Sequence, residues 1–344
     1  MATLESGSKA SSSSGVDGLQ NTSTPVTGEK GSTEGYVGGH TRRYRAVYNG
    51  FFGFYRSYNF PLWVIFGGGM LGFSLSRLQH FDYDGTFKND FALVVGQWYY
   101  FQSGRERIGM IIHLGAILPA GILVVLQFVP KIREKLLIFH RINGYLVILL
   151  GLLSSLATLA VIPHKQGGGA RISTQTAEAF LVIITTVSVV LAWWNIRRKR
   201  VDQHRAWMLR TWFYMGTIIT SRITEFIASP IITRIGGWYG VWTCDEIDFL
   251  YSQMGMPFPN SEYPTCVMPD GSINRDLYVA VKAVHSLEHP EQFGTSHTQP
   301  FGAMLWLSIV IHIIGVEFYL SMTQKETERL REVSHRKRVE AGLE

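Results

Sequence analysis

The sequence predicts an all-α, polytopic integral membrane protein, a helical bundle of about six transmembrane helices with the N and C termini in the cytosol. Three observations support this prediction. Long apolar stretches alternate with short polar ones along most of the 344 residues. Charged residues make up only 17% of the chain, below the roughly 25% that is usual for soluble domains. Lys and Arg gather beside the apolar stretches, so the net charge of +6 indicates cytosolic membrane loops and not nucleic-acid binding.

The first part of the chain differs in composition from the rest. Residues 1–40 are rich in Ser, Gly and Thr and contain no apolar core, which predicts a disordered tail and no cleaved signal peptide. A six-span membrane domain is expected over residues 41–322. It is followed by a charged, cytosolic and helical tail over residues 323–344.

Each predicted span is bounded by residues that favour a membrane interface or end a helix. Pro130 and the basic residues that follow it end the second span, Pro163 ends the third, and Pro230 ends the fifth. Four consecutive basic residues from Arg197 to Arg200 end the fourth. We expect spans over residues 59–76, 108–129, 136–162, 176–196, 206–228 and 301–322.

A long loop over residues 234–300 is predicted to face the lumen or exterior, because Lys and Arg concentrate on the opposite side. It holds the only two cysteines, Cys244 and Cys266. An oxidising compartment favours a disulfide between them, which would stabilise the loop by about 3 kcal/mol; free thiols are the alternative. The chain is therefore expected to be a multi-pass protein of an endomembrane or the plasma membrane.

The fifth span carries an unusual number of ionisable side chains. It opens on His204 and Arg205 and runs through Arg210 to Arg222 and Glu225. In one regular helix, His204 and Arg222 would share a face about 27 Å apart along the axis. Charged groups inside a membrane are costly and usually face the interior of a bundle, so this helix is the first candidate for a functional site.

Polar and small residues of two further spans also lie on single helix faces. The stripe on the second span includes His113, and the stripe on the third begins at His140. Together with the fifth span they define a cytosolic layer with His140 and His204, and a lumenal layer with His113 and Arg222. The two stripes consist of His113, Ala116, Ala120 and Gln127, and of His140, Gly144, Gly151, Ser154, Ser155 and Thr158.

The cytosolic layer suggests a haem site. Two neutral imidazoles on facing helices are the usual axial ligands of haem b, and a neighbouring Arg can hold a propionate. His140 and His204 are the candidate metal ligands, and Arg141 and Arg205 are the candidate propionate partners. The first functional hypothesis is therefore a b-haem-type membrane oxidoreductase. In the lumenal layer, His113 would need His312 or His164 as its partner.

A cofactor-free enzyme is the main alternative. In it, His113, Arg222, Glu225 and Glu178 would line a lumen-side pocket as acid–base groups that modify an apolar small molecule. A non-catalytic receptor or scaffold is the third hypothesis. In all three the lipid bilayer is the expected partner, and the sequence indicates no particular protein partner.

Structural explanations of the same residues stay open. The His-Arg pairs could extend to lipid phosphates, and His113 could be a hydrogen-bonded packing residue. Arg222 and Glu225, at positions i and i+3, could simply neutralise each other.

The pattern of motifs resembles a poorly characterised family of predicted multi-pass membrane proteins, a domain of unknown function found in bacteria and, with extensions, in fungi. The resemblance covers about residues 60–228, and the tail, the cysteine loop and the sixth span look like the fungal-type extension. It implies a membrane bundle but no particular activity. The residues that carry it are His113, Leu126-Gln127-Phe128, His140-Arg141, Gly144-Tyr145, His204-Arg205-Ala206-Trp207-Met208-Leu209-Arg210 and Arg222.

A looser resemblance is to the six-span transmembrane b-type cytochromes that pass electrons from ascorbate to ferric iron or monodehydroascorbate. Those proteins hold haem between histidines of the second and fourth spans and of the third and fifth spans. His140 and His204 match the second of these pairs. The fourth span here has no histidine, so His113 lacks the partner that the resemblance implies.

Overall fold

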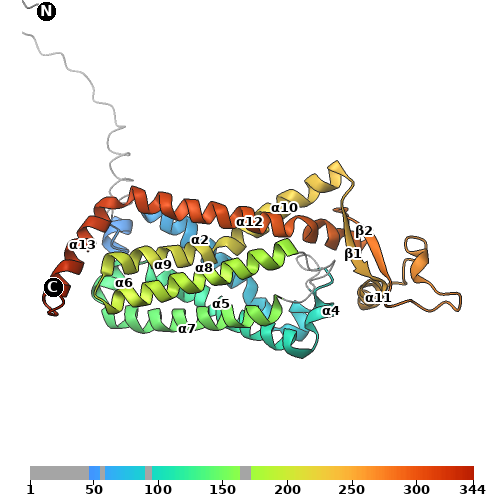
Figure 1. The fold of residues 1–344 in the computed structure, drawn as a ribbon, viewed down its shortest axis with the longest axis horizontal. Coiled ribbons are helices and arrows are strands. Elements are labelled where there is room, and N and C mark those ends of the chain that lie inside the picture. The colour runs from blue at the N-terminus through green and yellow to red at the C-terminus, as the bar shows by residue number, and fades with distance from the viewer. Residues whose placement is uncertain (1–45, 55–58, 90–94, 163–171) are drawn as a thin grey trace, which may run out of the picture. The chain divides into compact units, whose positions relative to one another are not determined.

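The computed structural model describes residues 46–54, 59–89, 95–162 and 172–344, of which residues 47–344 form one compact unit. The predicted disordered tail, residues 1–40, lies outside the described residues. Most of the unit is helical, with a single two-stranded sheet near one end (Figure 1). The elements are α2 (Asn59–Arg77), α4 (Trp98–Phe101), α5 (Gly104–Gln127), α6 (Pro130–Lys135), α7 (Leu137–Val161), α8 (Ile172–Arg197), α9 (Val201–Met215), α10 (Thr217–Ile235), β1 (Tyr239–Thr243), α11 (Cys244–Gln253), β2 (Tyr278–Lys282), α12 (Pro290–Met322) and α13 (Gln324–Val339).

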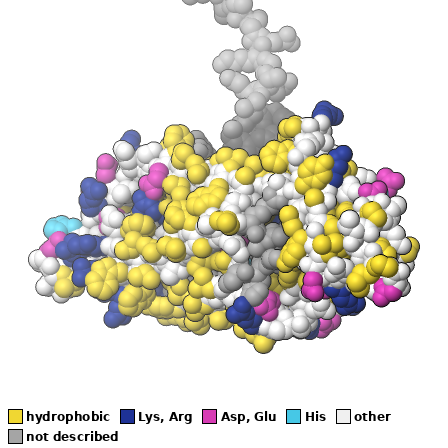
Figure 2. Space-filling model, turned by 45° about the vertical axis from the view of Figure 1, so that its right-hand side comes forward, with side chains coloured by type: hydrophobic (Ala, Val, Ile, Leu, Met, Phe, Trp, Pro, Cys, Tyr) yellow, Lys and Arg dark blue, Asp and Glu magenta, His cyan; other side chains and the backbone are white. Residues whose placement is uncertain are grey.

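Within these described residues, four helices are long and apolar enough to cross a membrane: α5, α7, α8 and α12. Their large apolar side chains point outward as well as inward; Leu149 is 63% exposed and Leu156 65%. Figure 2 shows hydrophobic side chains spread over the helical part, with most charged side chains toward its ends. Such outward apolar surface is stable only in lipid, and helices satisfy their backbone hydrogen bonds there without water. The all-α membrane bundle predicted from the sequence is therefore confirmed.

The prediction of one regular fifth span is wrong. The segment is interrupted at Gly216, where α9 ends and α10 begins, so His204 and Arg222 belong to different helices. A close approach by the sixth span accompanies the break. A Cβ atom at Gly216 would lie 3.3 Å from Cε1 of His312 on α12. The predicted first span is observed as α2, although it is not among the four strongly apolar helices.

The helices pack in neighbouring pairs, chiefly α5 with α7, α8 with α9 and α10 with α12. Small residues allow the closest approaches. Gly302 of α12 faces Ser173 and Thr174 of α8 so closely that a Cβ atom would clash with them. The stripes predicted on the second and third spans meet between α5 and α7, where His113 contacts Ser154 and Thr158. Helix packing thus accounts for both stripes.

The prediction of a long loop over residues 234–300 also needs correction, because the segment contains two strands and a helix. β1 and β2 pair antiparallel, with Tyr239 opposite Lys282, and α11 follows β1 directly. A buried core forms around Trp242, Ile247, Leu250 and Val281. We call residues 236–289 the disulfide domain, because Cys244 and Cys266 are joined within it, with Cα atoms 5.7 Å apart. The predicted disulfide is confirmed.

The last span begins earlier than predicted. Pro300 was expected to precede the helix, but it lies inside α12, which starts at Pro290. Residues of this extra segment are held by the disulfide domain: Glu291 accepts hydrogen bonds from the hydroxyls of Tyr251 and Tyr263, at 2.9 and 3.0 Å. These hydrogen bonds stabilise the part of α12 that precedes Pro300. The sequence alone predicted that this proline would not lie inside a helix.

The charged tail is helical, as predicted, and it packs on the bundle. Within α13, Ser334 donates to Oδ1 of Asp202 at 2.7 Å, and the backbone N–H of Val201 donates to Ser334. Arg210 of α9 forms a two-bond ion pair with Glu317 of α12, at 2.6 and 2.9 Å. We call this end of the bundle, opposite the disulfide domain along α12, the basic end.

Candidate functional site

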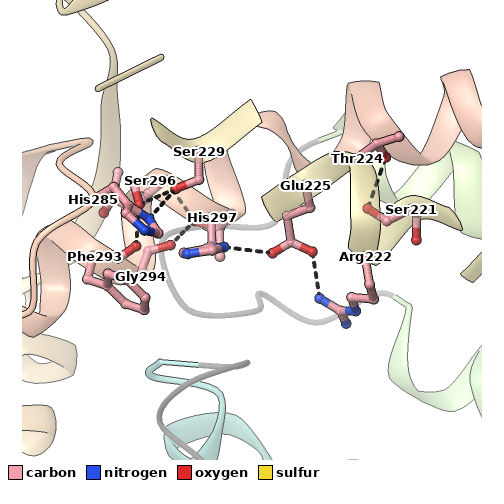
Figure 3. A network of polar contacts seen from close by, with 12 residues as sticks. Ser221, Arg222, Thr224, Glu225, Ser229, His285, Phe293, Gly294, Ser296 and His297 are labelled. Atoms are coloured by element: carbon pink, nitrogen blue, oxygen red, sulfur yellow. Dashed lines mark hydrogen bonds and ion pairs between the residues drawn. The ribbon is translucent and has the colours of Figure 1, made fainter. Parts of the chain in front are cut away.

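A buried polar network lies between α10 and α12, close to the disulfide domain (Figure 3). Glu225 is at its centre and is only 3% exposed. Its Oε2 accepts a hydrogen bond from Nη1 of Arg222 at 2.9 Å. Its Oε1 lies 3.4 Å from Nδ1 of His297, an ion pair when the imidazole is protonated. The carboxylate is therefore flanked by a guanidinium on one side and an imidazole on the other.

The helical repeat explains this placement. Arg222 and Glu225 are three residues apart on α10 and lie on one face, which packs against α12. The guanidinium of Arg222 lies over the ring of Phe301, 4.7 Å from its centroid, and such a contact stabilises a cation away from water. Phe226 packs edge-on against His297 with centroids 5.2 Å apart. Aromatic rings therefore enclose the charged groups.

A second chain of contacts joins the network to the disulfide domain. Ser229, one turn after Glu225, has its Oγ 2.9 Å from Nδ1 of His285 and 2.7 Å from Oγ of Ser296. His285 is an exposed residue of the segment between β2 and α12. Its ring lies 5.2 Å from that of His297. Partial burial, followed by the charge of His297, lowers the pKa of His285, so the neutral imidazole is favoured at physiological pH.

The buried imidazole has one nitrogen free for chemistry. His297 is 7% exposed, and its Nε2 is buried with no hydrogen-bond partner in the protein. Since buried nitrogens are nearly always bonded, an orphan of this kind needs a functional or solvent explanation. A carboxylate at Nδ1 and an unoccupied Nε2 is the arrangement of a histidine general base.

The structure brings together some of the residues predicted to act as acid–base groups. Arg222 and Glu225 are paired as expected. Glu178 is half-buried in α8 and follows Ala177, which packs on Phe301 beneath the guanidinium of Arg222. Its helix, α8, packs against α12.

His113 is not part of this network. Its Nδ1 contacts the hydroxyls of Ser154 and Thr158 at 2.9 Å each, between α5 and α7. The structure thus supports the packing role for this histidine.

The proposed haem ligands lie at the basic end. Nδ1 of His204 donates to the carbonyl of Ala192 at 2.9 Å, which leaves Nε2 as the acceptor nitrogen. His140 has a buried Nδ1 with no hydrogen-bond partner in the protein. Arg141 is exposed, and Arg205 donates to Thr323 at 3.2 Å. No group of three or more potential metal-ligating side chains occurs within the described parts of the chain.

The other histidines considered for haem take different positions. His312 is engaged by Thr220, with Nε2 at 2.7 Å from its hydroxyl, and His164 lies outside the described residues. His297 and His285 were missed in the sequence because residues 234–300 were assigned to a loop. A signal did exist: the segment from Pro290 to Pro300 contains a single charged residue, Glu291, and a proline suited to the first helical turn.

A bundle of long apolar helices that carries large apolar side chains on its outer surface is a multi-pass integral membrane protein. Residues 110–242 match the family described as "Predicted membrane protein (DUF2306)". This confirms the resemblance inferred from the motifs. The matched segment contains Arg222 and Glu225 but ends before His285 and His297.

One curated relative extends the similarity over most of the chain. "Ava biosynthesis cluster protein G" of Aspergillus versicolor is 23% identical over 312 residues, which cover 78% of this chain and 90% of that protein. No solved structure matches the chain.

Proposed function

We propose that the protein is a membrane enzyme that modifies an apolar metabolite by general acid–base catalysis at Glu225 and His297. The observation that carries the proposal is the buried Nε2 of His297, which has no protein partner although Nδ1 faces a buried carboxylate. The similarity to a protein named for a fungal biosynthesis cluster supports a role in metabolite tailoring. The surrounding Phe226 and Phe301 suit an apolar substrate.

The proposed step moves one proton and needs no oxidant. Nε2 of His297 removes a proton from an activated C–H or O–H group of the substrate. The imidazolium that results is stabilised by Glu225, while Arg222 keeps the carboxylate in position through its other oxygen. The imidazolium exchanges its proton with solvent and then donates a proton to a different atom of the substrate. The reaction is thus an isomerisation or a cyclisation with no change in overall oxidation state.

The test uses deuterium oxide as the solvent. Purified protein in lipid nanodiscs is incubated with an apolar extract of Aspergillus versicolor, and products are followed by mass spectrometry. Wild-type protein is expected to give a rearranged or deuterium-labelled product. Glu225→Gln and His297→Phe should each lower its formation by roughly 10²- to 10⁴-fold, the usual contribution of general acid–base catalysis.

A matched control is available at the other end of the bundle. Glu317 also forms an ion pair with an Arg, but at the basic end, and Glu317→Gln is expected to leave product formation unchanged. Equal activity of wild type, Glu225→Gln and His297→Phe would refute the proposal.

A second candidate, haem b binding between His140 and His204, is favoured by one specific observation. His204 has its Nδ1 bonded to a backbone carbonyl, and this bond orients Nε2 as metal-ligating histidines require. Nδ1 of His140 is buried without a protein partner, so this nitrogen is not already used in a hydrogen bond. Bound haem would supply one-electron transfer, and Arg141 and Arg205 would hold its propionates.

The haem candidate has an independent test. Protein expressed with added haem precursor should show a Soret absorption band that is lost in His140→Ala and in His204→Ala. A purified, folded protein without that band would exclude this candidate and leave the acid–base proposal standing.

A further inference from the structure

We infer that the site binds the hydrogen-bond-donating end of an apolar molecule, an alcohol or a phenol, at the paired imidazoles of His285 and His297. The inference rests on the proposed function, because it names the polar group of the substrate on which His297 acts. Its evidence is the set of polar contacts around the two rings (Figure 3), because the donor and acceptor of each hydrogen bond that leads to His285 can be assigned from them.

The donors and acceptors can be assigned by starting from the carbonyl group of Phe293, which can only accept a hydrogen bond. Ser296 lies 2.8 Å from the carbonyl of Phe293 and must donate its single hydroxyl hydrogen there. The contact between Ser296 and Ser229 then requires Ser229 to be the donor. With its own hydrogen used, Ser229 can only accept from His285. Satisfying all three contacts therefore places a proton on Nδ1 of His285.

This assignment leaves Nε2 of neutral His285 as a hydrogen-bond acceptor. The same holds for His297, because Nδ1 faces the carboxylate of Glu225 and Nε2 is unpartnered. The rings are 5.2 Å apart, and two imidazolium charges so close would repel each other. The pair thus presents two neighbouring acceptors, one buried and one at the exposed edge.

Two adjacent acceptors select their ligand. They cannot bond to each other, and a carboxylate or phosphate would bring only further acceptors next to Glu225. A hydroxyl group has a single hydrogen and donates to one nitrogen at a time, and the buried Nε2 of His297 is the one that lacks any other partner. The aromatic side chains of Phe226 and Phe293, which pack on His297 with centroids at 5.2 and 4.7 Å, suit the apolar part of an alcohol or a phenol.

Nitrogen NMR of isotopically labelled histidine tests the tautomers directly. Spectra of nanodisc-embedded protein at neutral pH should show His285 with its proton on Nδ1, with assignment from His285→Asn. Ser229→Ala removes the acceptor and should shift this resonance. Ser221→Ala is the matched control, because Ser221 is equally buried on α10 but donates to the carbonyl of Ile218; it should cause no shift.

Matched amphiphiles test the ligand class. 4-Nonylphenol is expected to shift the Nε2 resonance of His297, while dodecanoate and dodecane are not. A proton on Nε2 of His285, or a response to dodecanoate equal to that of the phenol, would overturn the inference. These readouts need no turnover. Phenol binding without deuterium incorporation would therefore refute the catalytic proposal alone, and incorporation with the wrong tautomer would refute this inference alone.

Discussion

The histidines within the membrane helices differ in what their ring nitrogens contact, and this separates structural from chemical roles. His113 bonds to two hydroxyls between α5 and α7, whereas His297 keeps a buried nitrogen free. The sequence placed His113 in an apolar span and His297 in a loop, and it could not show what either ring nitrogen contacts. That distinction depends on partners that are more than forty residues away for His113 and more than seventy away for His297. Arg222 and Glu225 were identifiable because their spacing alone predicts a pair.

His113→Leu is therefore expected to weaken packing without affecting chemistry. Ser154 and Thr158 lose a partner, but Thr158 keeps its bond to the carbonyl of Ser154. Hydrogen bonds between membrane helices contribute about 0.6 kcal/mol on average and up to about 2 kcal/mol, so a small fall in thermal stability is expected. The measurement is thermal unfolding in nanodiscs alongside product formation. Loss of product with unchanged stability would instead assign His113 to catalysis.

Among the helices and strands, the largest difference from the sequence-based prediction is the interruption between α9 and α10. The apolar pattern predicted one continuous span because Gly216 is tolerated in a helix and leaves no signature of a break. The break is explained only by contacts with α12, because His312 lies against Gly216 and bonds to Thr220 one turn further. Helices α5, α7 and α8 were predictable to within a few residues, because no neighbouring element interrupts them.

Gly216→Val tests this contact between elements. The added Cβ atom would meet Cε1 of His312 and the carbonyl of Phe213, each at 3.3 Å, and the remaining methyl groups need still more space. We expect destabilisation of about 1–3 kcal/mol, typical of overpacking, measured as a lower unfolding temperature. Gly315→Val on α12 is the control, because no neighbouring atom lies within 4 Å of its Cβ position. Equal stability of the two variants would show that His312 does not constrain the break.

The molecule as a whole joins a membrane bundle to the disulfide domain, and the polar network lies where they meet. Composition and charge predicted the bundle, and the two cysteines predicted the crosslink. The small sheet was not predictable, because β1 and β2 are short and separated by more than thirty residues. Their pairing depends on the core around Trp242. His285 reaches the network only through this pairing, since it follows β2 by three residues.

Removing the disulfide should loosen this junction. The crosslink closes a loop with a sequence separation of 22, for which chain entropy predicts about 3 kcal/mol of stabilisation. Cys244→Ser combined with Cys266→Ser is expected to increase hydrogen exchange in residues 236–289 while α5 and α7 stay protected, as measured by mass spectrometry. Uniform exchange across the protein in both forms would show that the disulfide is dispensable for the domain.

The junction is also expected to respond to pH through Glu246, which is 4% exposed and lies in α11 outside the membrane helices. Burial raises the pKa of Glu246 to about 7, although the backbone N–H of Thr243 opposes this shift. A carboxyl group with a raised pKa takes up a proton on folding, so stability is highest below the unfolded pKa and falls as pH rises toward 7. The loss is on the order of 1–3 kcal/mol.

Hydrogen exchange of the disulfide domain should thus be slower, relative to the intrinsic rate, at pH near 5 than near 8. Glu246→Gln keeps an acceptor for Thr243 but does not titrate, and it should remove most of this difference. If the difference persisted unchanged in Glu246→Gln, another group would be responsible for the pH response.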